Sequence, residues 1–308
     1  MKWNRILNML FFHESWDIMV IKNDGSHSFP DNTLDILRRS TAQRLKKKFT
    51  FQADPFLLEK EDKLYIFYEA FNFRNSKGIL RCRILDKNLK ELDDVKLEGF
   101  DNLKCHLSFP FLFTTNGTLY MIPESSERKE VILFQAIDFP VRWKQVKVLL
   151  SDAPLTDNVL LTVNERFYLM STSMENELVI HTAPEVTGKW EKITPLLEVC
   201  NEHNRSAGGP YTIDNKMYIL TQECTPDTYG KSVFIKELNN LDISTFKESL
   251  VDNIPPSHNN SDGVHTLNFS DNYIVYDTKK NVFSPLSFLK KVAYKFIVKY
   301  RTLQLAWR

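Results

Sequence analysis

The chain has 308 residues, of which 43% are hydrophobic and 12% aromatic, so it can bury a sizeable core. Its 40 basic residues are balanced by 39 acidic ones, which gives no general reason to expect nucleic acid as a partner. The cysteines Cys82, Cys105, Cys200 and Cys224 form no CxxC pair, which argues against a structural zinc site and favours reduced thiols in a cytosolic protein.

The N-terminal region predicts a strand followed by a helix. We expect no signal peptide, because the first residues lack a small-residue cleavage site, and no apolar run reaches the roughly 18 residues of a membrane span. Residues 16–21 predict a strand, and residues 31–48 are compatible with a helix capped by Asp31 or Asn32. We interpret its final basic residues, 46–48, as a solvated helix end, with an anion contact as the alternative.

A strand–turn–strand unit recurs along the chain. Its clearest copy, CHLSFPFLFTTNGTLYMIPE at residues 105–124, has two apolar segments around the turn residues Asn116 and Gly117. The second strand of each copy carries a tyrosine, and these tyrosines are Tyr65, Tyr120, Tyr168, Tyr218 and Tyr273, with spacings of 55, 48, 50 and 55. A period of about 50 residues with room for four strands is the length of one propeller blade. Five copies therefore predict an all-β, five-bladed β-propeller.

The repeat also predicts how the chain is divided. Four blades are expected at about residues 49–98, 100–150, 152–200 and 204–252, and a thinner fifth blade at about 262–283. The N-terminal strand would complete this last blade, which closes the ring and removes a free sheet edge. We therefore expect one propeller over residues 1–283 and a separate helix over residues 284–308.

The tail differs from everything before it. Apolar residues recur on one face at helical spacing: Leu286, Leu289, Ala293, Phe296, Ile297, Tyr300, Leu303 and Trp307. Six lysines and arginines accompany them, with no acidic residue. One interpretation is a helix packed on the propeller with a solvated basic face. The other, which we adopt as a working hypothesis, is an interfacial helix on an anionic membrane, peripheral to the cytoplasmic side of the inner membrane.

Carboxylates are predicted to meet on the propeller axis, because the first strand of each blade lines the central funnel. The tyrosine alignment places Asp54 there in the first blade, Phe109 in the second and Asp157 in the third, and the shorter fourth copy places Gly209. Sugar chemistry uses such carboxylate pairs, one as acid or base and the other as nucleophile or charge stabiliser. A capping or turn role is the alternative for each of them.

Further polar residues are predicted around the same funnel. Glu124, four positions after its tyrosine, is a third candidate catalytic residue. The candidate substrate-binding residues are Glu69, His106, Arg205, Gln222, Glu223 and His265. A guanidinium such as that of Arg205 suits a phosphate or a carboxylate, whereas a lone histidine is more often structural. We expect no resident cofactor, and Ca²⁺ binding by the carboxylates stays open.

Motifs in a fixed order resemble those of one family. They are FQADPFLL…LYIFYEAF, HLSFPFLF…GTLYMIPES, FP-x-x-W, RSAGGP, QEC-x-x-x-x-YG and GVHTLN, over about residues 16–277. The family is the propeller domain at the N-terminus of plant glucosamine inositolphosphorylceramide transferases and in bacterial relatives. Its fold is similar to that of arabinanase- and fructosidase-like hydrolases. The resemblance implies a carbohydrate substrate and, from the bacterial relatives, a part in surface-glycan assembly.

The resemblance also implies roles for single residues. Asp54 resembles the catalytic base of the arabinanase-like hydrolases, and Asp157 resembles their pKa-tuning aspartate. The glutamate of their E-G-P motif is missing, because this chain has Gly208, Gly209 and Pro210 there. Hydrolysis would then need a proton from Glu124 or Glu223. A transferase needs it less, because a phosphate leaving group departs without full protonation.

These considerations lead to one leading hypothesis and two alternatives. The leading hypothesis is a glycosyltransferase for a cell-surface polysaccharide such as a capsule, with a phosphate-activated donor that could be a nucleotide sugar. Asp54 would activate the acceptor, Asp157 and Glu124 would hold the sugar, and Arg205 and His106 would face the donor phosphate. The alternatives are an arabinanase-like hydrolase with a relocated acid and a non-catalytic glycan-binding or scaffolding propeller.

Overall fold

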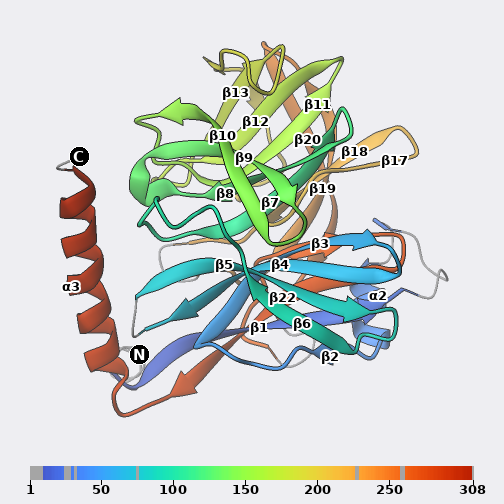
Figure 1. Cartoon of the computed structure of the whole chain (residues 1–308). Coiled ribbons are helices and arrows are strands. Elements are labelled where there is room, and N and C mark those ends of the chain that lie inside the picture. The colour runs from blue at the N-terminus through green and yellow to red at the C-terminus, as the bar shows by residue number, and fades with distance from the viewer. Residues whose placement is uncertain are drawn as a thin grey trace.

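A computed structural model describes residues 10–23, 29–30, 33–73, 76–225, 229–256 and 261–306. Within these residues, five β-sheets follow one another around a central axis, and a C-terminal helix lies along one side of them (Figure 1). The predicted all-β, five-bladed propeller with a C-terminal helix is therefore confirmed.

The first three blades have the same strand order, with each strand antiparallel to the next. Blade 1 comprises β3 (Phe51–Lys60), β4 (Lys63–Asn72), β5 (Lys77–Asp86) and β6 (Glu91–Lys96). Blade 2 comprises β7 (Ser108–Thr115), β8 (Thr118–Glu124), β9 (Glu130–Asp138) and β10 (Arg142–Ser151), with the short helix η1 (Ser126–Arg128) between β8 and β9. Blade 3 comprises β11 (Thr156–Val163), β12 (Arg166–Thr172), β13 (Leu178–Ala183) and β14 (Glu191–Ile193).

Blade 4 departs from this pattern at both edges. Its inner strand is split into β16 (Arg205–Ser206) and β17 (Tyr211–Ile213), both of which pair with β18 (Lys216–Gln222). The sheet continues through β19 (Val233–Leu241) and β20 (Thr245–Ile254). Its outer edge is β15 (Leu196–Glu198), which runs parallel to β20. Residues 196–198, predicted to belong to the third blade, therefore extend the fourth.

The fifth blade joins the two ends of the described chain. It comprises β21 (Leu267–Phe269), β22 (Tyr273–Phe283), β1 (Phe12–Lys22) and β2 (Gln43–Arg44), in that order. The pairing of β1 with β22 is continuous from Phe12 opposite Phe283 to Lys22 opposite Tyr273. Hydrogen bonds between the first and last strands thus close the ring without leaving a free edge there.

The predicted helix over residues 31–48 is wrong in its extent. The helix α2 covers only Thr33–Arg39, and the proposed caps Asp31 and Asn32 lie outside the described residues. Strand β2 then pairs with β1, and the buried Leu45 donates its backbone N–H to the carbonyl of Ile18. Sheet pairing and burial in the core outweigh the helical pattern of this segment.

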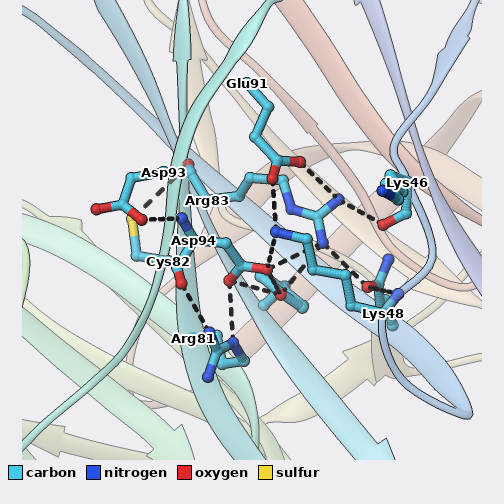
Figure 2. Close-up of polar contacts among 10 residues, drawn as sticks. Lys46, Lys48, Arg81, Cys82, Arg83, Glu91, Asp93 and Asp94 are labelled. Carbon is cyan, nitrogen blue, oxygen red and sulfur yellow. Dashed lines mark hydrogen bonds and ion pairs between the residues drawn. The ribbon is translucent and has the colours of Figure 1, made fainter.

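The basic residues 46–48 are bonded to the propeller and do not form a solvated helix end. Lys47 Nζ lies 3.0 Å from a carboxylate oxygen of Asp17. Lys48 Nζ lies 2.5 Å from Glu91 and 3.1 Å from Asp94 (Figure 2). These ion pairs attach the segment before β3 to blades 5 and 1.

A buried ionic cluster in blade 1 holds the segment of residues 46–48 in place. Arg83 is fully buried and donates to the carbonyl of Lys46 at 2.9 Å and to Gln52 Oε1 at 3.0 Å (Figure 2). It also pairs with Asp94 at 3.2 Å. Burial opposes ionisation of Asp94, but Arg81 and its other cationic neighbours outweigh burial and lower the pKa of Asp94 below its ordinary value.

Aromatic side chains fill the space between neighbouring blades. Phe56 of blade 1 contacts Phe109 of blade 2 edge-on, with ring centroids 4.8 Å apart. Trp143 of the FP-x-x-W motif is buried and meets Phe67 of blade 1 edge-on at 5.9 Å. Such edge contacts between large rings hold the sheets at a fixed separation.

The C-terminal helix α3 (Ser287–Ala306) is attached to the propeller through few but specific contacts. Arg301 donates to both oxygens of Glu127 at 2.6 and 2.8 Å and to the carbonyl of Ser76 at 2.9 Å. The ring of Tyr294 meets that of Phe71 at 5.8 Å. No helix among the described residues is both long and apolar enough to cross a membrane.

We expect Asp94→Asn to destabilise the protein strongly. The substitution removes the buried carboxylate that Arg83, whose side chain is 0% exposed, contacts at 3.2 Å, and among the described residues it leaves only Glu91, at 3.5 Å, as a charged partner. Breaking a buried pair costs about 3 kcal/mol or more. Urea denaturation would measure the change in the free energy of unfolding. The matched control is Asp138→Asn, which breaks an exposed pair with Arg142 and should cost less than about 1 kcal/mol. Equal losses in the two variants would contradict the structural role of the cluster.

Candidate functional site

The inner strands of blades 1 to 3 share one irregularity that points a residue toward the axis. In each there is a β-bulge, and its first residue has a positive φ: 53° at Asp54, 42° at Phe109 and 48° at Asp157. Residues other than glycine rarely adopt this conformation, which is often found at functional sites. The bulges occur at the same register, so the predicted equivalence of these three residues agrees with the strand pairing.

The fourth blade places a different residue at this position. Arg205 pairs with Gln222, as Ala53 pairs with Glu69 in blade 1, so Ser206 takes the place predicted for Gly209. The prediction failed because the inner strand of blade 4 is interrupted. Gly208 packs so closely on the carbonyl of Leu267 that a Cβ atom there would lie 2.2 Å from it.

These strands surround a cavity of about 880 Å³ at one end of the funnel. Its charged and polar lining includes Asp54, Glu69, His106, Ser108, Glu124, Asp157, Arg205, Tyr229 and His265. We call the four carboxylates Asp54, Glu69, Glu124 and Asp157 the carboxylate floor. The cavity is large enough for a small ligand such as a sugar with a substituent.

Asp54 is buried and bonded on both oxygens. Oδ1 accepts from the Thr266 hydroxyl at 2.9 Å, and Oδ2 accepts from the backbone N–H of Phe109 at 3.1 Å. Burial raises the pKa of Asp54 to about 7, and Glu69 adds to the rise, although His265 opposes it. A carboxyl group with a pKa near neutrality can accept a proton from a substrate and give it up again.

A histidine–aspartate pair lies beside Asp54. His265 Nδ1 is 2.6 Å from Asp277 and its Nε2 is 3.7 Å from Asp54. Burial alone would lower the pKa of His265, but the two carboxylates outweigh burial and raise it to about 9. The ring also stacks on Trp16 with centroids 3.9 Å apart. We infer that His265 is a cation at neutral pH.

The same three groups are the candidate ligands for a metal ion. One ligand atom each from Asp54, His265 and Asp277 lies within 4.8 Å of the others, the one such buried cluster found among the described residues. Asp277 already accepts hydrogen bonds from the backbone N–H groups of Asp54, His265 and Thr266. Its oxygens are therefore engaged, and the donor set fits a hydrogen-bond network better than a cation site.

An ionic group from three blades forms the opposite side of the floor. Arg205 Nε lies 2.5 Å from Asp157, and its NH2 lies 3.8 Å from Glu124. Burial and the neighbouring Asp157 raise the pKa of Glu124 to about 8, although Arg205 opposes the rise. Glu124 is therefore protonated at neutral pH and can donate a proton, as a general acid does.

His106 connects the floor to the C-terminal helix. Its Nε2 lies 3.0 Å from Glu69, and its Nδ1 accepts from the backbone N–H of Gly78 at 3.0 Å. Burial opposes the charged ring, whereas Glu69 favours it and raises the pKa of His106. The Gly78 N–H needs an unprotonated Nδ1 and so favours the neutral ring with its proton on Nε2. Its backbone N–H donates at 2.8 Å to Glu127, the residue that Arg301 of α3 binds.

The structure brings most of the predicted site residues together. Asp54, Asp157, Glu124, Glu69, His106, Arg205 and His265 all line the cavity. Gln222 is buried behind the lining and donates to Asp157 at 3.2 Å and to the carbonyl of Ser206 at 2.9 Å. Glu223 does not line the cavity, because it is bonded to Lys231 and Ser232.

Sequence reasoning missed the aromatic wall of the cavity. Phe51 stacks on Phe71 at 4.3 Å, and Phe73 and Tyr294 surround Phe71 on the same side. We call these four residues the aromatic wall. The motif F-x-F at residues 71–73 was a signal for part of it, because alternate residues of a strand face one side. Tyr294 gave no such signal, since its place depends on the docking of α3.

This arrangement of groups can support acid–base chemistry on a polar ligand. Asp54 can act as a base and Glu124 as an acid, while Asp157, Arg205 and His265 surround them with charge and hydrogen-bonding groups. Planar aromatic faces beside such groups are suited to binding a ligand with both apolar and polar parts.

Comparisons with known proteins show the family of this chain. Residues 14–268 match the family described as Glucosamine inositolphosphorylceramide transferase 1, N-terminal. Glucosamine inositolphosphorylceramide transferase 1 of Arabidopsis thaliana is 30% identical over 210 residues, which cover 64% of this chain and 27% of the plant protein. The chain thus spans about a quarter of the length of the curated relatives it matches.

Solved structures share the fold at low sequence identity. An endo-arabinanase from Bacillus licheniformis is 9% identical with a TM-score of 0.52, over 74% of this chain and 93% of that one. An exo-β-1,3-galactanase from Phanerochaete chrysosporium, bound to β-1,3-galactotriose, is also 9% identical with a TM-score of 0.52, over 70% of this chain and 58% of that one. These likenesses support the propeller fold.

We expect the protein to lose stability as the pH rises from about 6 to about 9. The pKa values of Asp54, Glu124 and His265 are raised to about 7, 8 and 9, so each binds its proton more tightly when folded. The stabilisation is complete below the ordinary pKa values and is lost as the pH passes the raised ones, at about 1.4 kcal/mol per pKa unit. Urea denaturation across this pH range would measure it.

A matched pair of histidine variants controls this measurement. His265→Gln removes one of the raised groups and should flatten the pH dependence. His181→Gln should not, because burial lowers the pKa of His181 to about 4, well below the range studied. A stability that increased from pH 6 to 9 in the unsubstituted protein would contradict the protonation states inferred for the cavity.

Proposed function

The chain belongs to the family of the N-terminal domain of glucosamine inositolphosphorylceramide transferase 1, and on this premise we propose that its cavity catalyses glycosyl transfer. The donor would be a phosphate-activated sugar, and the acceptor would be a glycan of a cell-surface polysaccharide. The observation that carries the proposal is the placement of two buried carboxyl groups with raised pKa, Asp54 and Glu124, in the lining of one cavity.

In this proposal each group of the floor has one task. Asp54, the group with the lower pKa of the two, removes the proton from the acceptor hydroxyl. Glu124 and Asp157 hold the hydroxyl groups of the transferred sugar, and Arg205 holds Asp157 in position through its 2.5 Å contact. Preorganised charges of this kind lower the barrier without reorganisation during the reaction.

Glycoside hydrolysis is the second candidate, and Glu124 favours it. The family resemblance leaves hydrolysis without its usual acid, since Gly208, Gly209 and Pro210 replace the E-G-P motif. Glu124 lines the same cavity as Asp54 and holds its proton at neutral pH, so it could protonate a leaving sugar oxygen. The solved hydrolases share the fold of this chain, and the likeness extends to the fold alone.

We also propose that α3 holds the protein on the inner face of the cytoplasmic membrane. Its outward side chains are apolar and exposed: Leu289 is 60%, Phe296 is 71% and Tyr300 is 65% exposed. Lys295 and Lys299 are exposed on the same helix, and no acidic residue occurs in it. An apolar strip flanked by lysines suits the interface of an anionic bilayer. Trp307, and the side chain of Leu303, lie outside the described residues.

Asp54→Asn is expected to abolish turnover. The purified protein would be incubated with a panel of nucleotide sugars, with and without a membrane extract as acceptor, and nucleotide release would be measured. The amide cannot accept the acceptor proton, and loss of a general base lowers the rate by about 10²–10⁴-fold. Glu223→Gln, outside the cavity, is the control and should retain activity.

The panel separates the candidates by their products. Nucleotide release that needs Asp54 supports transfer. Reducing sugar from a furanoside substrate, without nucleotide release, would replace transfer by hydrolysis. Glycan binding without turnover in either assay would contradict both and leave a binding module.

The membrane proposal predicts binding to anionic vesicles through the outer face of α3. We expect co-sedimentation with phosphatidylglycerol vesicles and little with phosphatidylcholine vesicles. Replacing Leu289 and Phe296 by serine removes two large apolar contacts, so binding should weaken about tenfold or more. The control is Ile137→Ser, which removes a 56% exposed side chain from β9. Equal binding by the α3 variant and the control would contradict the proposal.

A further inference from the structure

The C-terminal helix forms part of the cavity wall. Tyr294 of α3 lines the cavity, whereas Phe296 and Tyr300, on the outer side of the helix, are 71% and 65% exposed (Figure 1). The family match ends at residue 268, before α3 begins, so the family resemblance assigns this helix no role. Its part in the site follows from its own contacts with the propeller.

Arg301 docks α3 on two blades at once. Its guanidinium donates to both carboxylate oxygens of Glu127 in blade 2, at 2.6 and 2.8 Å, and to the carbonyl of Ser76 in blade 1, at 2.9 Å. The Ser76 hydroxyl in turn donates to the carbonyl of Phe73 at 2.9 Å. Only 12% of the Arg301 side chain is exposed, so these charge-assisted bonds are largely shielded from water. They hold α3 in one place on blades 1 and 2.

This docked position brings Tyr294 against the aromatic wall. Its ring meets that of Phe71 edge-on, with centroids 5.8 Å apart, and Phe71 stacks on Phe51 at 4.3 Å. Phe51 and Phe71 lie opposite each other on β3 and β4, so strand pairing fixes their stack. The aromatic wall therefore has one part that belongs to the sheet and one part, Tyr294, that depends on the docking of α3.

The Tyr294 phenol lies close enough to the carboxylate floor to respond to its charge. Burial raises the pKa of Tyr294, and the charges of Glu127 and Glu69 add to the rise, although Arg301 opposes it. Glu69 belongs to the carboxylate floor. The phenol therefore keeps its proton at neutral pH and can donate a hydrogen bond to a ligand on the floor.

We propose that Tyr294 is a ligand-binding residue and that α3, docked through Arg301, completes a sugar-binding subsite between the aromatic wall and the carboxylate floor. A sugar ring has an apolar face of C–H groups, which packs on aromatic rings, and hydroxyl groups at its edge, which bond to carboxylates. The cavity offers both surfaces in one lining. The inference deepens the proposed function by naming a residue that selects the sugar, and it rests on that function for the ligand being a carbohydrate.

Binding of the full chain to a printed array of oligosaccharides tests the subsite, followed by calorimetry with the glycan that gives the strongest signal. Tyr294→Ala removes the ring that α3 supplies, so the affinity should fall about fivefold or more, as expected for one aromatic contact. Tyr294→Phe keeps the ring and should retain most of the affinity.

The matched control is Tyr300→Ala, which removes the same side chain from the outer side of α3 and should change the affinity less than about twofold. Equal losses in Tyr294→Ala and Tyr300→Ala, or no glycan bound by the unsubstituted protein, would overturn the subsite.

Arg301→Gln tests the positioning role of the guanidinium. An isolated helix of 20 residues is only marginally stable in water, so an undocked α3 should exchange its backbone amide protons faster. We expect faster exchange in α3 together with a loss of glycan affinity similar to that of Tyr294→Ala. Arg301→Lys keeps the charge and should recover part of both.

The control for this docking contact is Lys299→Gln, which removes the same charge from an exposed position of α3 and should leave the exchange unchanged. Exchange that is equally slow in Arg301→Gln would show that docking does not depend on Arg301 and would overturn its positioning role.

Nucleotide release separates the subsite from the proposed function. Glycan binding that depends on Tyr294, without nucleotide release from any donor, would refute glycosyl transfer and leave a glycan-binding site. Nucleotide release that is insensitive to Tyr294→Ala would refute the subsite and leave glycosyl transfer.

Discussion

Buried carboxylates near the axis connect neighbouring blades, and the fold and the cavity both depend on these contacts. Asp277 of blade 5 accepts the backbone N–H of Asp54 in blade 1, and Asp54 accepts that of Phe109 in blade 2. On the other side, Arg205 of blade 4 bonds Asp157 of blade 3 and approaches Glu124 of blade 2. A carboxylate left unpaired here would be strongly destabilising, so the ring closes only when these partners meet.

The same constraint explains why the cavity contains carboxyl groups with raised pKa values. Four buried carboxylates lie close together in the cavity lining, and the nearby cations do not fully compensate them. The protonated forms of Asp54 and Glu124 are therefore favoured, so the pKa values of these two groups are raised toward neutrality. The positive φ of Asp54 and Asp157 adds local strain that the surrounding hydrogen bonds maintain. The same residues therefore connect the blades and set the protonation of the cavity.

The sequence predicts the parts of the fold that repeat, because each blade must satisfy the same packing. The strand tyrosines Tyr65, Tyr168 and Tyr218 are all buried, which is why their period locates the blades. Strand register then brings seven of the predicted polar residues into one cavity. Local sequence patterns predict the structure wrongly where contacts with a distant part of the chain determine it. The helix predicted to reach Lys48 ends at Arg39, because the residues after it pair with β1 as a strand. Ser206, not Gly209, lies at the axis position of blade 4, because the inner strand of that blade is interrupted.

The C-terminal helix shows most clearly what a local pattern cannot encode. Its apolar spacing predicts an amphipathic helix, but its position depends on Arg301 and Glu127, which are 174 residues apart in the chain. Glu127 also accepts the backbone N–H of His106, so the contact that docks the helix also holds a residue of the cavity. A force on the outer face of α3 would therefore be transmitted to the site through one carboxylate. Under the proposed function, contact of α3 with a membrane and the position of His106 would therefore depend on the same carboxylate, Glu127.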